Sequence, residues 1–504
     1  MADKTKALAK LHSLDTERMH LERAAAVLRW DQETCLPAKG VEDRAEQLAL
    51  IEGFAHEKLV NPETEGLLGE LEDAGDLSAQ EEDFLRVFRR DFRRAQRLSP
   101  EFVRECARAE GLSQAAWVEA RKNSDFAVFA PHLEKMIALA RKKSEYWGWA
   151  GTADSPYDGL LDIYEPGLGA ADMAGVFYPL RERLSALLEK ISAKAPALGA
   201  FLTGPQYDVQ RQDAFCRELL GGLGFDFTRS RLDLSAHPFT TTLGFNDVRI
   251  TTRYAAAEPL SGLFSVIHEG GHGFYELGID PALRSSCLAE GTSMGIHESQ
   301  SRLWENVIGR SRAFWEGWFP RFKEYFPQQL SGVGLDSFYR AMNRVSPSLI
   351  RVEADEVSYS LHIILRFELE RRLFQGTLAV QDLPGAWNRA MEEYLGLRPA
   401  CDAQGILQDV HWSMGAFGYF PSYALGNLYG LQFWEKLREC LPDTDAALGR
   451  RDYAAIHRWL GENIYRWGRR LEPSRLLLKI TGKELSAEPF LRYIERKYTE
   501  LYEL

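Results

Sequence analysis

The amino-acid sequence predicts a mainly α-helical fold that contains one small β-hairpin. In the first two hundred residues, apolar side chains recur every three or four positions inside charge-rich stretches, for example Phe84, Leu85, Phe88 and Phe92. This spacing is typical of amphipathic helices. The exception is 240–254 (TTTLGFNDVRITTRY), where apolar and polar residues alternate after a Phe-Asn-Asp turn signal, as they do in a hairpin.

The chain of 504 residues is expected to form a single domain spanning 1–504. Apolar residues make up 45% of it and aromatic residues 12%, which excludes the disordered and collagen-like classes. Proline and glycine cluster at 166–169 and 195–205, but both stretches are too short to be flexible linkers, so we predict turns there. The sequence shows no self-similarity at periods of about 20 to 50 residues, which excludes solenoids and propellers.

The composition also indicates which binding partners and which cellular compartment to expect. The 61 basic and 73 acidic residues leave a net charge of -12, which disfavours a nucleic-acid-coating protein because such proteins need a basic face. No window approaches the roughly 18 apolar residues that span a bilayer, and the charged start lacks the apolar core of a signal peptide. The six cysteines show no paired spacing, which suits free thiols. We therefore expect a cytoplasmic protein without nucleic-acid or membrane partners.

The predicted hairpin is followed directly by an apolar helix, LFSVIHEGGHGFYEL (263–277). Ser261 is its expected N-cap and Gly278 its expected C-cap. His268 and His272 lie four residues apart and therefore on one face of this helix. Both imidazoles can thus bind the same cation.

This HExxH pattern is typical of zinc proteases. Zinc binds imidazole nitrogens and, in a catalytic site, keeps one position for a water molecule whose pKa it lowers. Glu269, which stands beside the two histidines, would be the base that removes the proton from this water. The alternative is a chance match on an ordinary helix, and the position directly after a hairpin favours the metal site.

Two adjacent glycines, Gly270 and Gly271, lie inside this helix. Each costs up to ~1 kcal/mol relative to alanine, so their presence needs a structural reason. Either another backbone or the substrate approaches closely, or the helix crosses another helix in a crowded place. The sequence does not decide between these explanations.

A third metal ligand must come from a downstream acid, and three glutamates are candidates. Glu276 lies four residues past His272 on the same helix and would crowd the pair. Glu290 and Glu298 lie in later segments, and spacing does not decide between them. His297, next to Glu298, is either a hydrogen-bonding support for the metal ligands or an ordinary structural histidine.

Several short motifs follow one another along the chain. They are WDQETCLP (30–37), HPF (237–239), DVRIT (247–251), HEGGH (268–272), HESQ (297–300), IRVEAD (350–355) and GILQDVHW (405–412). In type and order they resemble the motifs of the Taq-type metallocarboxypeptidases, helical zinc peptidases that remove single residues from peptide C-termini. Cys35 stands where the family pattern leads us to expect methionine, and this departure affects no catalytic residue.

The resemblance implies the third ligand, the architecture and the metal. The glutamate of HESQ is the family's ligand, so Glu298 is favoured over Glu290. The implied fold is a large helical zincin-like peptidase with a long, deep groove and a small β-hairpin or sheet next to the zinc helix. The implied metal is Zn2+, with Co2+ as an alternative, and the implied assembly is a homodimer.

A carboxypeptidase must bind a free C-terminal carboxylate, which arginine does through two parallel hydrogen bonds. Periodicity predicts a helix over 350–370. Its polar face would carry Arg351, Asp355, Ser358, His362 and Arg366. By itself this face could be an ordinary solvated stripe. The resemblance makes Arg351 the candidate anchor of the substrate carboxylate and Arg249 a second cation at the closed end of the groove.

The hairpin before the zinc helix offers a strand edge with which an extended peptide substrate can pair. The alternative is that the motif DVRIT (247–251) has no contact with substrate and merely stabilises a turn through the side chain of Asp247. By resemblance, His237 of the HPF motif is a further candidate for substrate binding.

Amide hydrolysis passes through a tetrahedral oxyanion, which a neutral donor from a facing segment usually helps to stabilise. The run HWSMGAFGYFPSYALGN offers His411, Tyr419 and Tyr423. A histidine followed by tyrosines at this spacing is similar to the helical oligopeptidases of the same superfamily, where such residues hydrogen-bond the transition state. Tyr423 is the first candidate and His411 the second, while Tyr419 is a candidate for substrate binding. The alternative is that the tyrosines only pack in a glycine-rich turn.

The favoured hypothesis is a cytoplasmic zinc metallocarboxypeptidase that acts on peptides with a free C-terminus. Glu269 would activate water and later protonate the leaving amine. An endo-acting zinc oligopeptidase would share the metal residues but lack a carboxylate clamp. A structural-zinc interaction protein, the alternative of another class, would have a fourth protein ligand and no open position.

Overall fold

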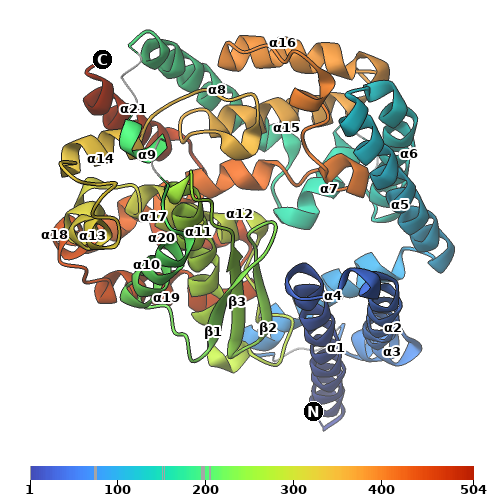
Figure 1. The fold of residues 1–504 in the computed structure, drawn as a ribbon. Coiled ribbons are helices and arrows are strands. Elements are labelled where there is room, and N and C mark those ends of the chain that lie inside the picture. Colours follow the sequence, from blue (N-terminus) through green and yellow to red (C-terminus); the bar gives the residue numbers. More distant parts are fainter. Residues whose placement is uncertain (1, 73–76, 150, 152–153, 195–198, 204–205) are drawn as a thin grey trace.

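Helices dominate the computed structural model of the chain, as predicted (Figure 1). The structure describes residues 2–72, 77–149, 151, 154–194, 199–203 and 206–504. Its helices are α1 (Ala2–Thr34), α2 (Val41–Leu59), α3 (Pro62–Glu70), α4 (Ala79–Gln96), α5 (Pro100–Asn123), α6 (Phe126–Tyr146), α7 (Ser155–Tyr164), α8 (Ala170–Ser192), α9 (Ala200–Thr203), α10 (Val209–Gly222), α11 (Pro259–Leu277), α12 (Met294–Arg302), α13 (Arg312–Tyr325), α14 (Leu335–Met342), α15 (Tyr359–Gln375), α16 (Leu383–Leu395), α17 (Pro421–Cys440), α18 (Thr444–Gly449), α19 (Ala454–Asn463), α20 (Pro473–Thr481) and α21 (Glu488–Tyr502). Its strands are β1 (Ser230–Leu234), β2 (Thr240–Gly244) and β3 (Asp247–Thr252). Within the described ranges, no helix is both long and apolar enough to cross a membrane.

The first four helices, α1 to α4, form an N-terminal lobe with a hydrophobic cluster of its own (Figure 1). Phe84 and Phe88 of the predicted amphipathic face are almost completely buried in this cluster. The cluster closes against the segment 279–289, which contributes Leu283 and Leu288. Because this segment connects α11 to α12, the lobe lies next to the two helices that carry the predicted metal ligands.

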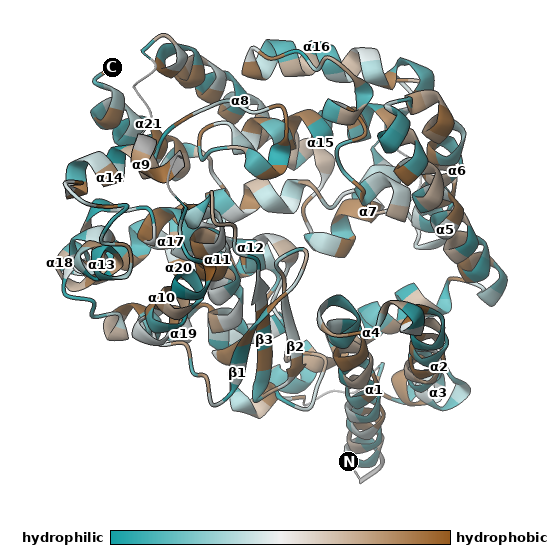
Figure 2. Ribbon diagram, viewed as in Figure 1, coloured by the Kyte–Doolittle hydropathy of each residue, from teal (hydrophilic) through white to brown (hydrophobic). Residues whose placement is uncertain are grey.

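The remaining helices share one larger core, and α17 lies near its centre. Leu425, Leu428 and Phe433 of this helix have no exposed surface. Helices at the surface carry both hydrophilic and hydrophobic positions (Figure 2), which is the pattern expected of a layer that covers a core. The stretch 166–169 is a turn between α7 and α8, as predicted, whereas 195–198 and 204–205 of the second predicted turn lie outside the described residues.

The predicted hairpin is present, and a third strand extends it into a small sheet. The strands β2 and β3 pair antiparallel, and β1 pairs parallel with β3, so the order is β1-β3-β2. Val248 and Ile250 of β3 are fully buried. The first strand was missed because Leu232 is its only buried residue, which leaves no alternating pattern to detect.

Two helix starts differ from the prediction. The helix that carries HEGGH, α11, begins at Pro259 rather than after Ser261, because proline at the first position is already compatible with a helix. The helix predicted over 350–370 begins only at Tyr359, as α15. Arg351 therefore lies in a short 3-10 turn before it. The carboxylate of Asp355 accepts hydrogen bonds from the backbone N–H groups of Val357 and Ser358, which competes with helix formation before Tyr359.

Candidate metal centre and peptide-binding residues

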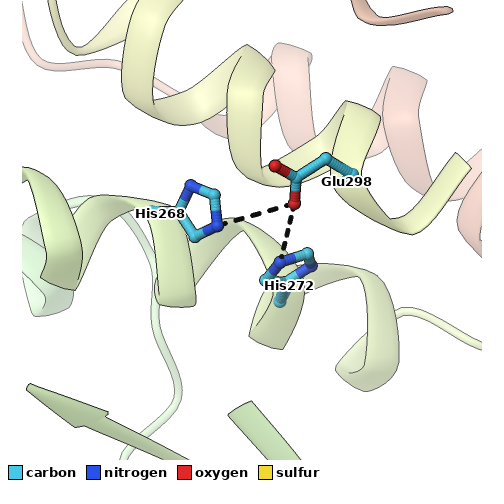
Figure 3. A group of neighbouring side chains, drawn as sticks. All are labelled: His268, His272 and Glu298. Carbon is cyan, nitrogen blue, oxygen red and sulfur yellow. Dashed lines mark ion pairs between the residues drawn. The ribbon is translucent and has the colours of Figure 1, made fainter. Parts of the chain in front are cut away.

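Two helices bring three side chains together at one point, as Figure 3 shows. His268 and His272 of α11 lie one turn apart, and Glu298 of α12 faces both. Its Oε2 atom is 3.6 Å from Nε2 of His268 and 3.3 Å from Nε2 of His272. The three possible ligand atoms all lie within 4.8 Å of one another.

The two separations from Glu298 are compatible with a zinc ion. A tetrahedral site with metal–ligand distances of about 2.0 to 2.1 Å places neighbouring ligand atoms about 3.3 to 3.4 Å apart. The other two candidate acids lie elsewhere: Glu276 contacts His297, and Glu290 forms an ion pair with Arg469. Of the three acids that sequence spacing left open, only Glu298 reaches both imidazoles.

Close packing of helix backbones explains how Glu298 reaches α11. A Cβ atom at Gly271 would lie 2.7 Å from the backbone of Gln300 and Ser301 in α12. On the other side of α12, a Cβ atom at Gly426 of α17 would lie 2.5 Å from the side chain of Glu298 itself. Close approach of another backbone is therefore the reason for glycine at position 271.

Each histidine is held by a hydrogen bond through its other ring nitrogen. Nδ1 of His268 lies 2.9 Å from Oε2 of Glu305, and Nδ1 of His272 lies 2.5 Å from Nδ1 of His297. His297 in turn contacts Glu276 at 2.7 Å. Such partners fix the orientation of imidazoles that bind metals. His297 is thus placed as a supporting residue, one of the two interpretations that the sequence allowed.

Charged neighbours keep Glu298 ionised. Burial opposes ionisation, but the guanidinium of Arg302 and the two histidines hold the pKa of Glu298 far below its ordinary value. Arg302 donates from Nε to Oε1 at 2.8 Å. Burial lowers the pKa of His272 to about 4, whereas the carboxylates of Glu298 and Glu305 outweigh burial at His268 and raise its pKa to about 8. An ionised carboxylate beside the neutral imidazole of His272 suits metal binding, whereas a metal ion must displace the proton that the neighbouring carboxylates hold on His268.

Glu269 lies next to this group and is itself buried. Its Oε2 atom accepts a hydrogen bond of 2.6 Å from Oγ1 of Thr240 in β2. Burial raises the pKa of Glu269, while His268 and the Thr240 hydrogen bond act in the opposite direction. The sheet therefore orients the carboxylate that the sequence predicts to be the general base.

Arg351 is buried and is held by a carboxylate of the GILQDVHW motif (405–412). Its Nε and Nη2 atoms both donate to Oδ1 of Asp409, at 3.0 and 2.8 Å. The other oxygen of Asp409 accepts two hydrogen bonds from Arg366, which has no exposed surface. Nη1 of Arg351 is directed at the hydroxyl of Tyr359, 3.5 Å away. One edge of the Arg351 guanidinium is thus occupied by the protein itself.

The three aromatic candidates gather around Arg351. The guanidinium of Arg351 lies 5.0 Å from the ring centre of Tyr423, and Tyr423 lies 3.4 Å from Nε2 of His411. The ring of Tyr419 packs against both His411 and Tyr423. Burial raises the pKa of Tyr419 to about 12 and also raises that of Tyr423, so both are neutral hydroxyl donors at ordinary pH. Burial also lowers the pKa of His411 to about 4.

The remaining two predicted substrate residues lie on the sheet and in the loop before it. Arg249 of β3 pairs with Asp247 through two hydrogen bonds of 2.9 Å and stacks on Trp30 of α1, 4.3 Å from the ring centre. His237 is exposed, and its carbonyl oxygen accepts a hydrogen bond from Ser235. The roles of Arg249 and His237 in substrate binding stay predictions.

Sequence reasoning missed several side chains that complete the site. Arg302 and Glu305 lie four and seven residues after Glu298, so helical spacing could have found them on the ligand's face. Tyr359 bridges the two parts of the site, because the guanidinium of Arg302 lies 4.2 Å from its ring centre. Neither Tyr359 nor Thr240 has a local signal, since each acquires its neighbours only through folding.

The HExxH helix, the glutamate from a facing helix and the buried carboxylate beside them define a helical metallopeptidase. The family described as "Carboxypeptidase Taq (M32) metallopeptidase" matches residues 10–498, so the chain belongs to this family. It is a metal-dependent carboxypeptidase, and the endo-acting and structural-zinc alternatives are not favoured.

Individual relatives are similar to this protein over nearly the whole chain. The chain is 39% identical to carboxypeptidase 1 of Bacillus subtilis, covering 96% of both proteins, and 40% identical to thermostable carboxypeptidase 1 of Pyrococcus furiosus, covering 94% of this chain and 95% of the relative. Its fold matches the crystal structure of the M32 carboxypeptidase from Deinococcus radiodurans R1 with a TM-score of 0.96, at 42% identity over 99% and 100% of the two chains. The predicted family and fold class are thereby confirmed.

Proposed function

We propose that this carboxypeptidase releases single amino acids from the free C-terminus of peptides with Zn2+ held by His268, His272 and Glu298. The observation that carries the proposal is the convergence of these three side chains: their possible ligand atoms lie within 4.8 Å of one another, and Glu298 lies 3.6 and 3.3 Å from the two imidazole nitrogens. When bound, zinc would act as a Lewis acid on the scissile carbonyl and make water more acidic. Co2+ accepts the same donor set and is the alternative.

Glu269 is the proton carrier in this proposal. It takes the proton from the attacking water and delivers it to the leaving amine. Burial, which raises the pKa of Glu269, makes its carboxylate a stronger base than an exposed one. The hydrogen bond from Thr240 holds one carboxylate oxygen in place and leaves the other for the reaction.

Tyr423 and His411 supply the hydrogen bonds to the oxyanion of the substrate. Both are neutral, and their side chains lie within 3.4 Å of each other. A neutral donor that is already oriented stabilises developing negative charge without reorganisation. Tyr419, which packs against both rings, contributes a wall of the substrate site.

Arg351 anchors the C-terminal carboxylate of the substrate. Alone, the ion pair between Arg351 and Asp409 would be neutral and would attract a carboxylate weakly. Arg366 contributes a second positive charge to the same carboxylate, so the group of three carries a net charge of one. Nη1 of Arg351 and the hydroxyl of Tyr359 are the groups left to meet the substrate.

The sheet would guide the rest of the peptide. β2 is an edge strand, so its outer backbone groups can pair with an extended substrate. The family resemblance is what supports Arg249 and His237 as further substrate contacts. Both flank β2 in the sequence, one before it and one after it.

Further expectations concern the whole molecule. The lack of a linker in the sequence supports a single metallocarboxypeptidase domain over 1–504, and the family resemblance implies a homodimer. A cytoplasmic location is supported by the cysteines, since all six are free thiols.

The test compares a short peptide with a free C-terminus and its amidated twin. Zinc-loaded wild type should release free amino acid from the first peptide only, because only that peptide carries the carboxylate that Arg351 binds. Glu269→Gln should retain the metal and lose about 100-fold to 10,000-fold in kcat. Internal cleavage of both peptides would contradict the carboxylate anchor, and an active Glu269→Gln variant would exclude Glu269 as the base.

A further inference from the structure

A cavity outside the peptidase site is lined by one face of α4. The cavity has a volume of about 570 Å³, which is within the range of small-molecule sites. Its wall carries six arginines of the run RVFRRDFRRAQR, namely Arg86, Arg89, Arg90, Arg93, Arg94 and Arg97. We refer to it as the arginine cavity. It lies where the N-terminal lobe meets α7 and the end of α6, which add Asp162 and Trp147 to its lining.

Most of these guanidiniums have partners in the protein. Arg94 forms an ion pair with Asp162, and Arg97 donates to the carbonyl of Trp147. Arg86 donates to the carbonyl oxygen of Arg470 at 2.6 Å. These contacts hold the wall of the cavity in shape.

Arg90 differs from the other arginines of the cavity in that, among the described residues, it has no hydrogen-bond or ion-pair partner. Its Nε atom is buried. Arg93 has only a distant contact of 3.9 Å with Glu72, and both side chains are mostly exposed. Burial, together with the nearby guanidinium of Arg469, lowers the pKa of Arg90. A buried guanidinium nitrogen without a partner is unfavourable, and an anion within its reach would relieve this cost.

The charge of the cavity also opposes that of the whole chain. Among the residues that the structure describes, six arginines face three lining acids, Glu72, Glu82 and Asp162, which leaves an excess of three positive charges in a protein whose net charge is -12. An ordinary solvated surface of this chain would carry an excess of negative charge. The local excess therefore favours an anionic ligand.

The arrangement of the arginines indicates the type of anion. Arg86 and Arg97 are eleven residues apart, so the row extends about 16 Å along the helix axis. A ligand that meets several of them must carry several negative charges in a line. The planar guanidinium binds phosphate oxygens through two parallel hydrogen bonds. We propose that the arginine cavity binds a chain of phosphoryl groups, either an inorganic oligophosphate or the phosphate tail of a nucleotide.

Trp147 and Trp149, which also line the cavity, distinguish these two sources. An indole ring can stack on a nucleobase, so a nucleotide would gain contacts that an inorganic oligophosphate lacks. A ligand that joins α4 to α6 and α7 would also stabilise the contact between the lobe and the rest of the molecule. Its binding should then raise the melting temperature of the protein.

The experiment titrates the full-length, metal-loaded protein with tripolyphosphate, with a nucleoside triphosphate and with an amidated oligoglutamate peptide, using calorimetry. Wild type should bind tripolyphosphate with a Kd below about 1 mM. Arg90→Gln should weaken this binding about tenfold to a hundredfold, and Arg90→Lys should recover part of the loss. The matched control is Arg104→Gln on α5, because the Arg104 side chain is exposed and, within the described part of the chain, forms its ion pair with Glu101.

Each outcome decides for or against the site. Both glutamine variants keep the metal site, so extraction of metal by the phosphates affects them equally. Tighter binding of the nucleoside triphosphate assigns the tail of a nucleotide, and equal binding assigns the phosphoryl chain alone. Preference for the glutamate peptide, equal binding by Arg90→Gln and Arg104→Gln, or no binding at all would each overturn the proposal. Unchanged circular dichroism and unchanged peptidase activity of Arg90→Gln confirm that the variant is folded.

Discussion

Replacing Arg366 by glutamine should weaken substrate binding, although Arg366 is fully buried. The substitution leaves Arg351 paired with Asp409 and removes the second cation. The group that faces the substrate carboxylate then changes from a net charge of one to neutral. Because a carboxylate is bound in the ground state and in the transition state alike, the change should raise KM and leave kcat nearly unchanged.

The size of the effect follows from the chain of contacts. A carboxylate bound on the far side of Arg351 would lie on the order of 10 Å from the Arg366 guanidinium, given that Asp409 stands between the two arginines. With an effective dielectric constant of about 20, one unit charge at this distance contributes about 1.7 kcal/mol. This corresponds to an increase in KM of about 17-fold.

The assay is steady-state release of amino acid from a peptide with a free C-terminus. Arg366→Lys keeps the charge without the paired hydrogen bonds and should recover most of the affinity. Arg371→Gln is the control, because Arg371 belongs to the same helix but pairs with Asp154. A folded Arg366→Gln enzyme with the KM of wild type would refute the reasoning, since it would show that the charge of Arg366 does not reach the substrate.

Three further predictions concern the metal site and pH. Glu305→Gln should weaken metal affinity about 10-fold to 100-fold in a chelator competition, because it weakens the hydrogen bond that orients His268. Glu316 is exposed, so Glu316→Gln should leave the metal affinity unchanged. Gly271→Ala should lower stability by about 1 to 3 kcal/mol in thermal unfolding, because its Cβ would meet the backbone of α12; Gly69→Ala, which meets open space, is the control. Burial raises the pKa of Glu165 to about 7, so its folded form holds a proton that the unfolded chain releases near 4.5. Stability should therefore fall by about 3 kcal/mol as pH rises from about 4.5 to 7 and stay level above. Glu165→Gln should lack this loss in denaturant titrations at several pH values, and identical pH profiles for the two proteins would contradict the raised pKa.

Local spacing is what made much of this molecule predictable from its sequence. The amphipathic face around Phe84 and Phe88, the alternating strand at Val248 and Ile250, and the pair His268 and His272 all depend on periods of 3.6 or 2 residues. Such periods are properties of a single helix or strand, so the sequence contains them in full. The family resemblance added the order of the motifs and, with it, the class of reaction.

The tertiary structure decided which distant groups meet. Spacing left Glu276, Glu290 and Glu298 open as ligands, and the crossing of α11 with α12 at Gly271 brings only Glu298 to both imidazoles. The prediction of one polar helical face from Arg351 onward was wrong, because Asp355 caps the next helix by binding backbone N–H groups. Arg351 instead reaches Asp409, 58 residues away. Contacts of this kind depend on how separate elements pack, and no local pattern of residues records them.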